Sequence, residues 1–296
     1  MRPSGEPVSD RFIAVDWGTS NRREYLIEDR RVLAASRDDR GILEMGGRGY
    51  EESVAAIRAQ HGHLPVLIAG MAGSNRGWRE APYVDAPARP EDVAARLLRV
   101  EAGRTAIVPG VAWRDPDAPS VMRGEEVQLL GAVAAGLAPP TALLAQPGTH
   151  NKWVHMEDGA IGRFSTYMTG ELFALLRDHS ILSAQITAEI TPGPAFLEGV
   201  RHAQERPLTA ALFGARAAML LGFRAGEDTA DYVSGLLIGT DVGSAGVSGR
   251  EAYILSDATL GRLYAAAVAE LGGTAYLVDT VAAFVAGMSL IRSLSL

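Results

Sequence analysis

A four-residue motif that occurs twice constrains the fold of this chain more than any other feature. The pattern Gly-Thr-x-Asn begins at Gly18 and again, 130 residues later, at Gly148. In each copy a short apolar run enters the motif, and two further apolar runs follow it, separated by a second turn. Short apolar runs between turn residues are typical of β-strands in a meander. The chain therefore looks duplicated, with a three-stranded meander near the start of each half.

The repeated motif suits phosphate oxygens. Glycine lets the backbone approach a ligand closely, and Thr and Asn add hydrogen-bonding groups beside the free N–H groups of a turn. An ordinary hairpin turn is the alternative for either copy alone, but the matched pair favours phosphate. Lys152 lies in the second copy and is the only lysine among 28 Lys and Arg residues. Its compact charge suits a phosphate loop, although a chance survivor on the surface is the alternative.

Four segments resemble a known family. Residues 16–21 (DWGTSN) resemble the first phosphate motif of the actin-like ATPase superfamily, which includes sugar kinases, hexokinases and Hsp70 chaperones. More narrowly, 147–154 (PGTHNKWV), 168–173 (MTGELF) and 70–78 (GMAGSNRGW) are similar to segments of the 2-dehydro-3-deoxygalactonokinase family. The match extends from about Phe12 to the C-terminal region. It implies an α/β fold of two ribonuclease H-like (actin-like ATPase) domains with an interdomain cleft.

The resemblance also implies a division of labour between the domains. We expect an N-terminal domain at 11–140 that carries the first phosphate motif and binds a sugar acid. A C-terminal domain at 141–296 would carry the second phosphate motif and the adenosine site. The Ala-Pro-Pro sequence that ends at Pro140 marks the boundary.

Apolar spacing and turn residues predict the individual elements. In the first half they predict a meander at 12–36, helices at 50–60, 91–101 and 121–136, and strands at 66–69 and 105–108. In the second half they predict a meander at 143–168, helices at 171–178 and 258–271, and a mostly helical stretch at 185–227. They also predict a helix or buried segment at 231–238, a strand at 252–255, and a strand and helix within 275–296.

The family resemblance implies ATP and Mg²⁺ as cofactors. Asp16 would hold Mg²⁺, directly or through water, and act in catalysis. Ser256 would contact adenine, where Ser256-Asp257 replaces the glycines usual in the superfamily. The residues implied in phosphate binding are Gly18, Thr19, Ser20, Asn21, Gly148, Thr149, His150, Asn151 and Lys152.

Two adjacent glutamates are candidates for the general base. By resemblance, either Glu125 or Glu126 takes the proton from the substrate hydroxyl. The alternative is that acidic residues in the first turn of a helix are favoured by the helix dipole whatever their function.

The same resemblance places the sugar acid on a glycine-rich loop after the strand at 66–69. In the family, the pair after the loop serine often reads Arg-Gln where this chain has Asn-Arg, so the positive charge has moved by one residue. An ordinary surface loop, and an N-cap role for Thr169, are the alternatives. The implied substrate-binding residues are Ser74, Asn75, Arg76, Trp78, Thr169 and Glu171.

Composition and the absence of several known motifs argue against other functions. A net charge of −7 and a pI near 5.4 argue against nucleic acid or an anionic membrane as partner. The chain has no cysteine, which excludes disulfides and thiol chemistry. It also lacks His-Glu-x-x-His, Gly-x-Ser-x-Gly, Gly-x-x-x-x-Gly-Lys and Gly-x-Gly-x-x-Gly motifs. No apolar run reaches 18 residues, and residues 1–10 are expected to be a polar, disordered leader, so we expect a cytoplasmic protein.

The resemblance implies a reaction. It is the transfer of phosphate from ATP to the 6-hydroxyl of 2-dehydro-3-deoxy-D-galactonate, in galactose or galactonate catabolism. Two alternatives stay open: a kinase of another sugar acid or sugar, and a nonenzymatic, nucleotide-switched binding protein of the same fold. A homodimer is also left open.

Overall fold

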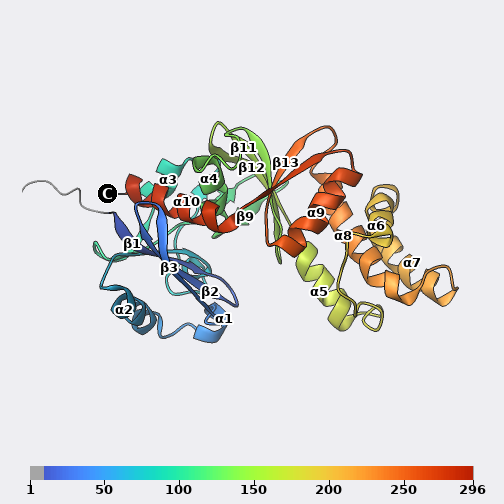
Figure 1. The fold of residues 1–296 in the computed structure, drawn as a ribbon, viewed down its shortest axis with the longest axis horizontal. Coiled ribbons are helices and arrows are strands. Elements are labelled where there is room, and N and C mark those ends of the chain that lie inside the picture. Colours follow the sequence, from blue (N-terminus) through green and yellow to red (C-terminus); the bar gives the residue numbers. More distant parts are fainter. Residues whose placement is uncertain (1–9, 296) are drawn as a thin grey trace, which may run out of the picture. The chain divides into compact units, whose positions relative to one another are not determined.

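The computed structural model describes residues 10–295, so the expected leader lies outside the described residues except for Asp10. The chain forms two compact units (Figure 1). Unit 1 comprises the chain up to Pro140 together with 157–163 and the segment from Thr280 onward. Unit 2 comprises 141–156 and 164–279. The compact units differ from the expected domains, because 157–163 and the last helix group with unit 1 and not with the rest of 141–296.

Unit 1 is built on a six-stranded sheet in the order β3-β2-β1-β4-β7-β6. The first three strands are antiparallel, β4 and β7 run parallel to β1, and β6 is antiparallel to β7. The strands are β1 (Arg11–Trp17), β2 (Arg22–Glu28), β3 (Arg31–Asp38), β4 (Val66–Gly70), β6 (Leu98–Glu101) and β7 (Thr105–Ile107). A smaller sheet joins β5 (Val84–Asp85), β8 (Val111–Trp113) and β9 (Ser120–Met122).

Helices cover both faces of the unit 1 sheet because β1 alternates two apolar faces. Ile13, Val15 and Trp17 pack with α2 (Tyr50–His61). On the opposite face the Arg292 guanidinium of α10 (Thr280–Leu294) lies 5.0 Å over the ring of Phe12. The remaining helical elements are α1 (Ile42–Met45), the short turn η1 (Met71–Gly73), α3 (Pro90–Ala95) and α4 (Glu125–Ala134).

Two glycines let α10 pack tightly on α4. A Cβ at Gly131 of α4 would lie 1.9 Å from the Ala283 carbonyl oxygen, and a Cβ at Gly287 of α10 would lie 2.0 Å from the Val127 carbonyl oxygen. Any larger side chain at either position would push the helices apart. This close packing is why the last helix completes unit 1.

The second sheet, which lies in unit 2 except for the turn between β11 and β12 and the strand residues beside it, has five strands in the order β12-β11-β10-β13-β14. β10 is antiparallel to β11 and parallel to β13, and β13 is parallel to β14. The strands are β10 (Ala142–Gln146), β11 (Asn151–Glu157), β12 (Ala160–Tyr167), β13 (Glu251–Leu255) and β14 (Thr274–Val278). The helical elements are α5 (Thr169–His179), α6 (Pro194–Glu205), α7 (Leu208–Leu220), η2 (Gly226–Asp228), α8 (Thr229–Ser244) and α9 (Ala258–Glu270).

Five strands follow the same order in the two sheets, with β6 as an additional strand in the first, and this confirms the predicted fold class. Each begins with an antiparallel meander whose first strand then pairs in parallel with a later strand, as in ribonuclease H-like domains. Both predicted meanders and the predicted helical character of α6 to α9 are confirmed.

Two predicted helices of the first half are wrong in part. The helix expected at 91–101 ends at Ala95, because Leu98 pairs with Ile107 and the strand β6 forms instead. The helix expected at 121–136 begins only at Glu125, since Ser120–Met122 is strand β9.

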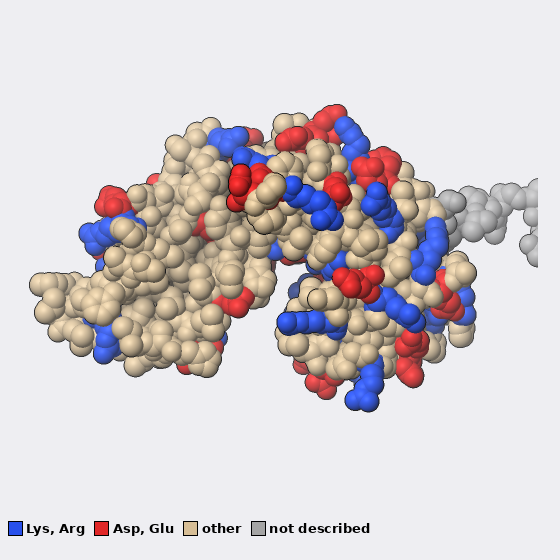
Figure 2. Space-filling view, turned by 180° about the vertical axis from the view of Figure 1, so that it is seen from behind, with Lys and Arg blue, Asp and Glu red and all other residues tan. Residues whose placement is uncertain are grey.

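Within residues 10–295, no helix is both long enough and apolar enough to cross a membrane. On the face shown in Figure 2, acidic and basic side chains are interspersed rather than gathered into one basic surface.

Candidate functional site

The first Gly-Thr-x-Asn motif forms a tight turn between β1 and β2. The N–H of Gly18 donates to the Asn21 carbonyl at 2.9 Å. The carbonyls of Gly18 and Thr19 accept from the backbone at the start of α1, at 3.1 and 3.2 Å. Thr19 and Ser20 are exposed at the tip, and within the described chain their N–H groups have no hydrogen-bond partner. The turn therefore leaves two backbone donors without a partner at an exposed tip, which suits an anion.

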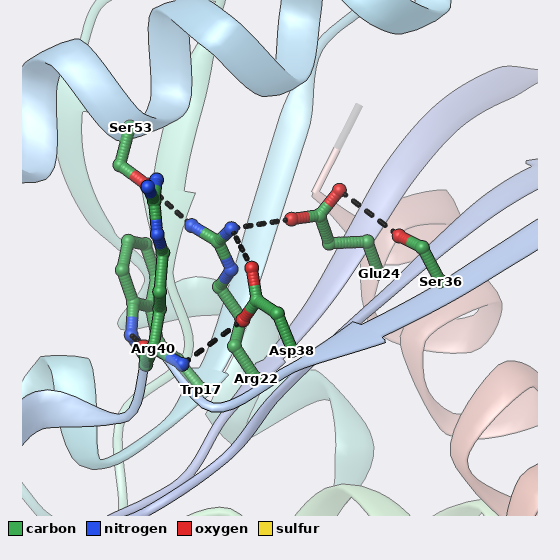
Figure 3. A network of polar contacts seen from close by, with 7 residues as sticks. All are labelled: Trp17, Arg22, Glu24, Ser36, Asp38, Arg40 and Ser53. Atoms are coloured by element: carbon green, nitrogen blue, oxygen red, sulfur yellow. Dashed lines mark hydrogen bonds and ion pairs between the residues drawn. The ribbon is translucent and has the colours of Figure 1, made fainter.

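A buried arginine secures both ends of this turn (Figure 3). The Arg22 guanidinium donates to Ser53 of α2, pairs with Asp38 at 2.5 Å, and lies 5.1 Å over the Trp17 ring. It also pairs with Glu24 at 3.0 Å. The Trp17 indole N–H donates to the Arg40 carbonyl at 2.8 Å. Because Trp17 and Arg22 flank the turn, this network fixes its two strands.

The second motif repeats the construction in unit 2. The N–H of Gly148 donates to the Asn151 side-chain oxygen at 2.7 Å. The Thr149 carbonyl accepts from the N–H of Glu171 at the start of α5, at 3.0 Å. Thr149 and His150 are exposed at the tip. The two predicted turns thus share their form, and each is closed by the start of a helix.

A glycine brings each helix start against its turn. A Cβ at Gly41, before α1, would lie 2.3 Å from the Thr19 carbonyl oxygen. A Cβ at Gly170, in the first turn of α5, would also lie 2.3 Å from its turn, at the Gly148 carbonyl oxygen. Only glycine permits these contacts without moving the turn.

The charged residues of the second turn lie close to its backbone. Lys152 is buried, with 4 % of its surface exposed, and its Nζ donates to the His150 carbonyl at 3.3 Å. The His150 ring pairs with the Glu171 carboxylate at 2.5 Å. The lysine charge is therefore held directly beneath the exposed tip.

Two predicted ligand residues are engaged inside unit 2. The Asn151 amide donates to the buried Asp241 carboxylate at 2.6 Å, so its NH₂ group shapes the turn instead of facing solvent. The Thr169 hydroxyl donates to the same carboxylate at 2.7 Å. The N-cap interpretation of Thr169 is wrong, because Met168 occupies that position. Sequence reasoning missed Asp241, whose only signal is an acidic residue in an apolar helix.

An apolar pocket of about 150 Å³ adjoins the second turn in unit 2. Gly148 and Asn151 contribute to its lining. The hydroxyl oxygen of Ser256 is enclosed and has no partner among the described residues, while Asp257 caps α9. The Ser256 hydroxyl oxygen is therefore not exposed, and the helix cap is supplied by its neighbour Asp257. The apolar lining residues include Phe173, Leu237, Ile238, Leu260 and Leu263.

In unit 1, the start of α4 reaches the carboxyl ends of β1 and β4. Gly70 ends β4 beside Trp17 of β1 and has a φ of +92°. A Cβ at Gly124, which precedes α4, would lie 3.0 Å from the Gly70 Cα. Ligands bind at the carboxyl ends of strands in open α/β sheets, so these glycines place the acidic residues of α4 at the expected edge.

Asp16 and Glu125 lie near one another at this edge. Burial raises the pKa of Asp16, the Arg23 guanidinium at 3.2 Å opposes the rise, and the negative charge of Glu125 adds to it. Glu125 is half-buried, and its carboxylate accepts from the N–H of Arg123 at 2.9 Å.

Glu126 has a different environment. It is 0 % exposed, and its carboxyl accepts from the N–H of Gly124 at 2.6 Å. Burial, with the charge of Glu125 adding to it, raises the pKa of Glu126 to about 8. Glu126 therefore carries its proton at neutral pH, whereas a general base must be able to accept one.

This raised pKa predicts a pH-dependent stability. Between about pH 4.5 and pH 8 the unfolded state has lost the Glu126 proton while the folded state keeps it. The unfolded state then binds fewer protons, so the free energy of unfolding falls as pH rises through this window, by up to roughly 5 kcal/mol. We expect Glu126→Gln to flatten that decline. Denaturant unfolding of both proteins at pH 5 and pH 8 measures it, and equal slopes would contradict the assignment.

The glycine-rich loop after β4 presents Asn75 and Arg76 to solvent, while Ser74 is buried and accepts from the N–H of Arg76 at 3.2 Å. Arg123 supports the loop from below, donating to the Ala81 carbonyl at 2.8 Å and lying 4.4 Å over the Tyr83 ring. Sequence reasoning missed this role of Arg123.

Trp78 anchors the same loop to α2. Its ring stacks on Tyr50 with centroids 5.9 Å apart, and its indole N–H donates to Glu51 at 2.9 Å. It lines a pocket of about 500 Å³ between α2 and β6. The indole is thus engaged by α2, whereas Asn75 and Arg76 stay exposed.

The predicted residues fall into two groups. Unit 1 holds Asp16, the first turn, the α4 glutamates and the loop at 74–78. Unit 2 holds the second turn, Ser256, and also Thr169 and Glu171, which contact the second turn.

Comparison with known proteins identifies the relatives of this chain. A profile of the 2-keto-3-deoxy-galactonokinase family matches residues 16–291. A protein of Rhizobium meliloti (strain 1021), named a probable 2-dehydro-3-deoxygalactonokinase, is 40% identical over 295 residues, which cover 94% of this chain and 95% of that protein. The 2-dehydro-3-deoxygalactonokinase of Escherichia coli (strain K12) is 36% identical over 240 residues, covering 80% and 81%.

A solved structure is also similar. A crystal structure from Sinorhizobium meliloti, of a protein provisionally assigned as a 2-dehydro-3-deoxygalactonokinase, superposes with a TM-score of 0.88 at 38% identity. The superposition covers 95% of this chain and 98% of the other.

Proposed function

The chain belongs to the 2-dehydro-3-deoxygalactonokinase family, and from that premise we propose that it transfers the γ-phosphoryl group of ATP to the 6-hydroxyl of 2-dehydro-3-deoxy-D-galactonate. The observation that carries this proposal is the pair of turns with one construction, each with exposed tip residues and a helix start against its carbonyls. Phosphoryl transfer depends mainly on positioning and charge stabilisation, which such turns supply. ATP supply and sugar-acid catabolism suit a cytoplasmic location.

In unit 2 we assign the nucleotide to the second turn and the adjoining pocket. The apolar side chains of the pocket suit a purine ring, and Gly148 belongs both to that pocket and to the turn. The exposed tip at Thr149 and His150 would donate to phosphate oxygens, and Lys152 would add a positive charge from beneath. Ser256 would act indirectly, through the start of α9.

In unit 1 we assign Glu125 as the general base. As the acceptor hydroxyl oxygen attacks the γ-phosphorus, its proton passes to the Glu125 carboxylate and ADP leaves. Glu126 suits this role less, because it is enclosed and its pKa of about 8 keeps it protonated at neutral pH. The first turn, Gly18 to Asn21, would hold phosphate oxygens in the same way as the second.

Asp16 fits a magnesium ligand. Magnesium in phosphoryl-transfer sites is usually held by one or two carboxylates together with substrate phosphates. The Asp16 side chain is 22% exposed at the end of β1, so an oxygen can reach an ion directly or through water. Mg²⁺ would offset the negative charge of the phosphates.

We assign the sugar acid to the exposed part of the loop after β4. Arg76 carries a planar guanidinium that matches a carboxylate. Asn75 adds neighbouring hydrogen-bonding groups, with Ser74 holding the loop backbone. Trp78 anchors the loop through α2, and Thr169 and Glu171 act with the second turn.

An ADP-release assay over a panel of acid sugars tests the proposal. We expect 2-dehydro-3-deoxy-D-galactonate to give the highest kcat/KM, with its 4-epimer, galactonate and galactose as the matched comparisons. A higher kcat/KM for another acid sugar would reassign the substrate. ATP consumption that no acceptor increases would instead favour a nucleotide-switched binding protein, the alternative allowed by the sequence.

A further inference from the structure

Asp241 of α8 is a buried acid at which several elements of unit 2 meet. Its carboxylate is 1 % exposed. One oxygen accepts from the Asn151 amide, the Thr169 hydroxyl and the Tyr264 hydroxyl at 2.6, 2.7 and 2.6 Å. The other accepts from the Trp153 indole N–H at 3.2 Å. The donors come from β11, α5 and α9, so one carboxylate ties three elements to α8.

The chemistry of this cluster requires an acceptor at its centre. All four partners are neutral side chains that donate to it, and an ionised carboxylate is the side chain that accepts only. Hydrogen bonds to a charged group are the strong ones, and here they oppose burial, which is the larger effect and raises the pKa of Asp241. An amide at position 241 would turn one of its own N–H groups toward these donors.

One of the bonds in which the two turns differ indicates a role for Asp241. In the first turn Gly18 donates to a backbone carbonyl, that of Asn21. In the second turn Gly148 donates to the side-chain oxygen of Asn151. The second turn therefore depends on which way the Asn151 amide faces. Its oxygen must point to Gly148 and its NH₂ group away, where that group donates to Asp241 and to the Tyr264 hydroxyl. Asp241 also accepts from that hydroxyl, so it orients both acceptors of the Asn151 amide.

We infer that Asp241 is a positioning residue for the second turn, setting the Asn151 amide so that the Gly148 N–H is held inward and the tip at Thr149 and His150 faces outward. Through Thr169 it also holds the start of α5, where Gly170 and Glu171 contact the turn. A phosphate role for this turn rests on the proposed function, whereas the control of its shape does not.

Asp241→Asn tests this inference, since it keeps the size of the side chain and removes its charge. We expect the Gly148 amide to exchange its hydrogen about 10- to 100-fold faster, the loss of one charge-assisted bond, while the Gly18 amide exchanges as before. The KM for ATP should rise by a similar factor, with the KM for the sugar acid within about twofold, because the loop at 74–76 belongs to unit 1. If Asp241 only supported the fold, its substitution would shift the KM for ATP and the KM for the sugar acid together.

Two further variants make the test decisive. Asp231→Asn is the matched control on the same helix, because that carboxylate accepts from Thr191 at 2.8 Å and lies away from the turn, so both KM values should stay unchanged. Thr169→Val removes one donor to Asp241 at nearly constant volume and should speed Gly148 exchange less. If Asp241→Asn does not fold, Thr169→Val alone tests the positioning role of Asp241.

The outcomes separate the two proposals. If the Gly148 amide exchanges at the wild-type rate in Asp241→Asn, or in Thr169→Val, the positioning role is overturned. Faster exchange with an unchanged KM for ATP supports control of the turn but removes its phosphate role, and with it that part of the proposed function.

Discussion

Replacing Glu125 by Gln is expected to lower kcat by about 10²- to 10⁴-fold while both KM values change little, because a positioned base contributes that much to the rate and little to ground-state binding. The side chain is half-buried beside Asp16, and substitution by an amide of the same size leaves the start of α4 intact. Steady-state kinetics at saturating ATP and sugar acid measure it, with a thermal unfolding curve to verify folding.

Glu126→Gln is the matched control one residue along the same helix. Glu126 is enclosed and carries its proton at neutral pH, and Gln resembles that neutral form, so we expect activity at pH 7 to be largely kept. If Glu126→Gln were inactive and Glu125→Gln active, the roles of the two glutamates would have to be exchanged.

Replacing Lys152 by Ala is expected to lower kcat/KM for ATP by about 10²- to 10³-fold, the loss usual for one preorganised group that stabilises transition-state charge. The ammonium group lies beneath the tip of the second turn, bonded to the His150 carbonyl. Lys152→Arg should not restore the activity, because the planar guanidinium of arginine is larger than the compact ammonium group and this position is buried.

The control for lost charge is Arg177→Ala in the same unit. Arg177 is an exposed cation on α5 whose one ion-pair partner among residues 10–295 is its neighbour Asp178. Exposed ion pairs contribute little, so the kinetics should match the wild type. Calorimetric titration of ATP completes the test, and wild-type affinity together with wild-type turnover in Lys152→Ala would remove the second turn from the nucleotide site.

Local signals in the sequence were enough to predict the two turns and most of the sheets. Each Gly-Thr-x-Asn motif lies between apolar runs, and the structure of such a turn depends on its own residues. The ambiguity at 91–101 shows the limit of local signals. Leu98 and Val100 alternate with charged residues, yet they also extend the helical spacing of Val93 and Leu97, and only the pairing with β7 settles the state.

Contacts distant in sequence could not be predicted. Nothing within residues 280–294 says that this helix packs against Val127 of α4 rather than inside unit 2. The sequence likewise presents Asp241 as one acid in an apolar helix, because its four donors come from other elements. The choice between Glu125 and Glu126 needed burial, which sets the pKa, and burial is a property of the assembled fold.

The return of α10 to unit 1 affects the order in which the protein can be assembled on the ribosome. The chain of unit 2 is fully synthesised once Asp279 has emerged, whereas unit 1 must wait for the segment that follows. Domains tend to fold as units during synthesis. The helix that carries Glu125 thus gains its packing partner last, so the chain of unit 2 is complete well before unit 1 can be.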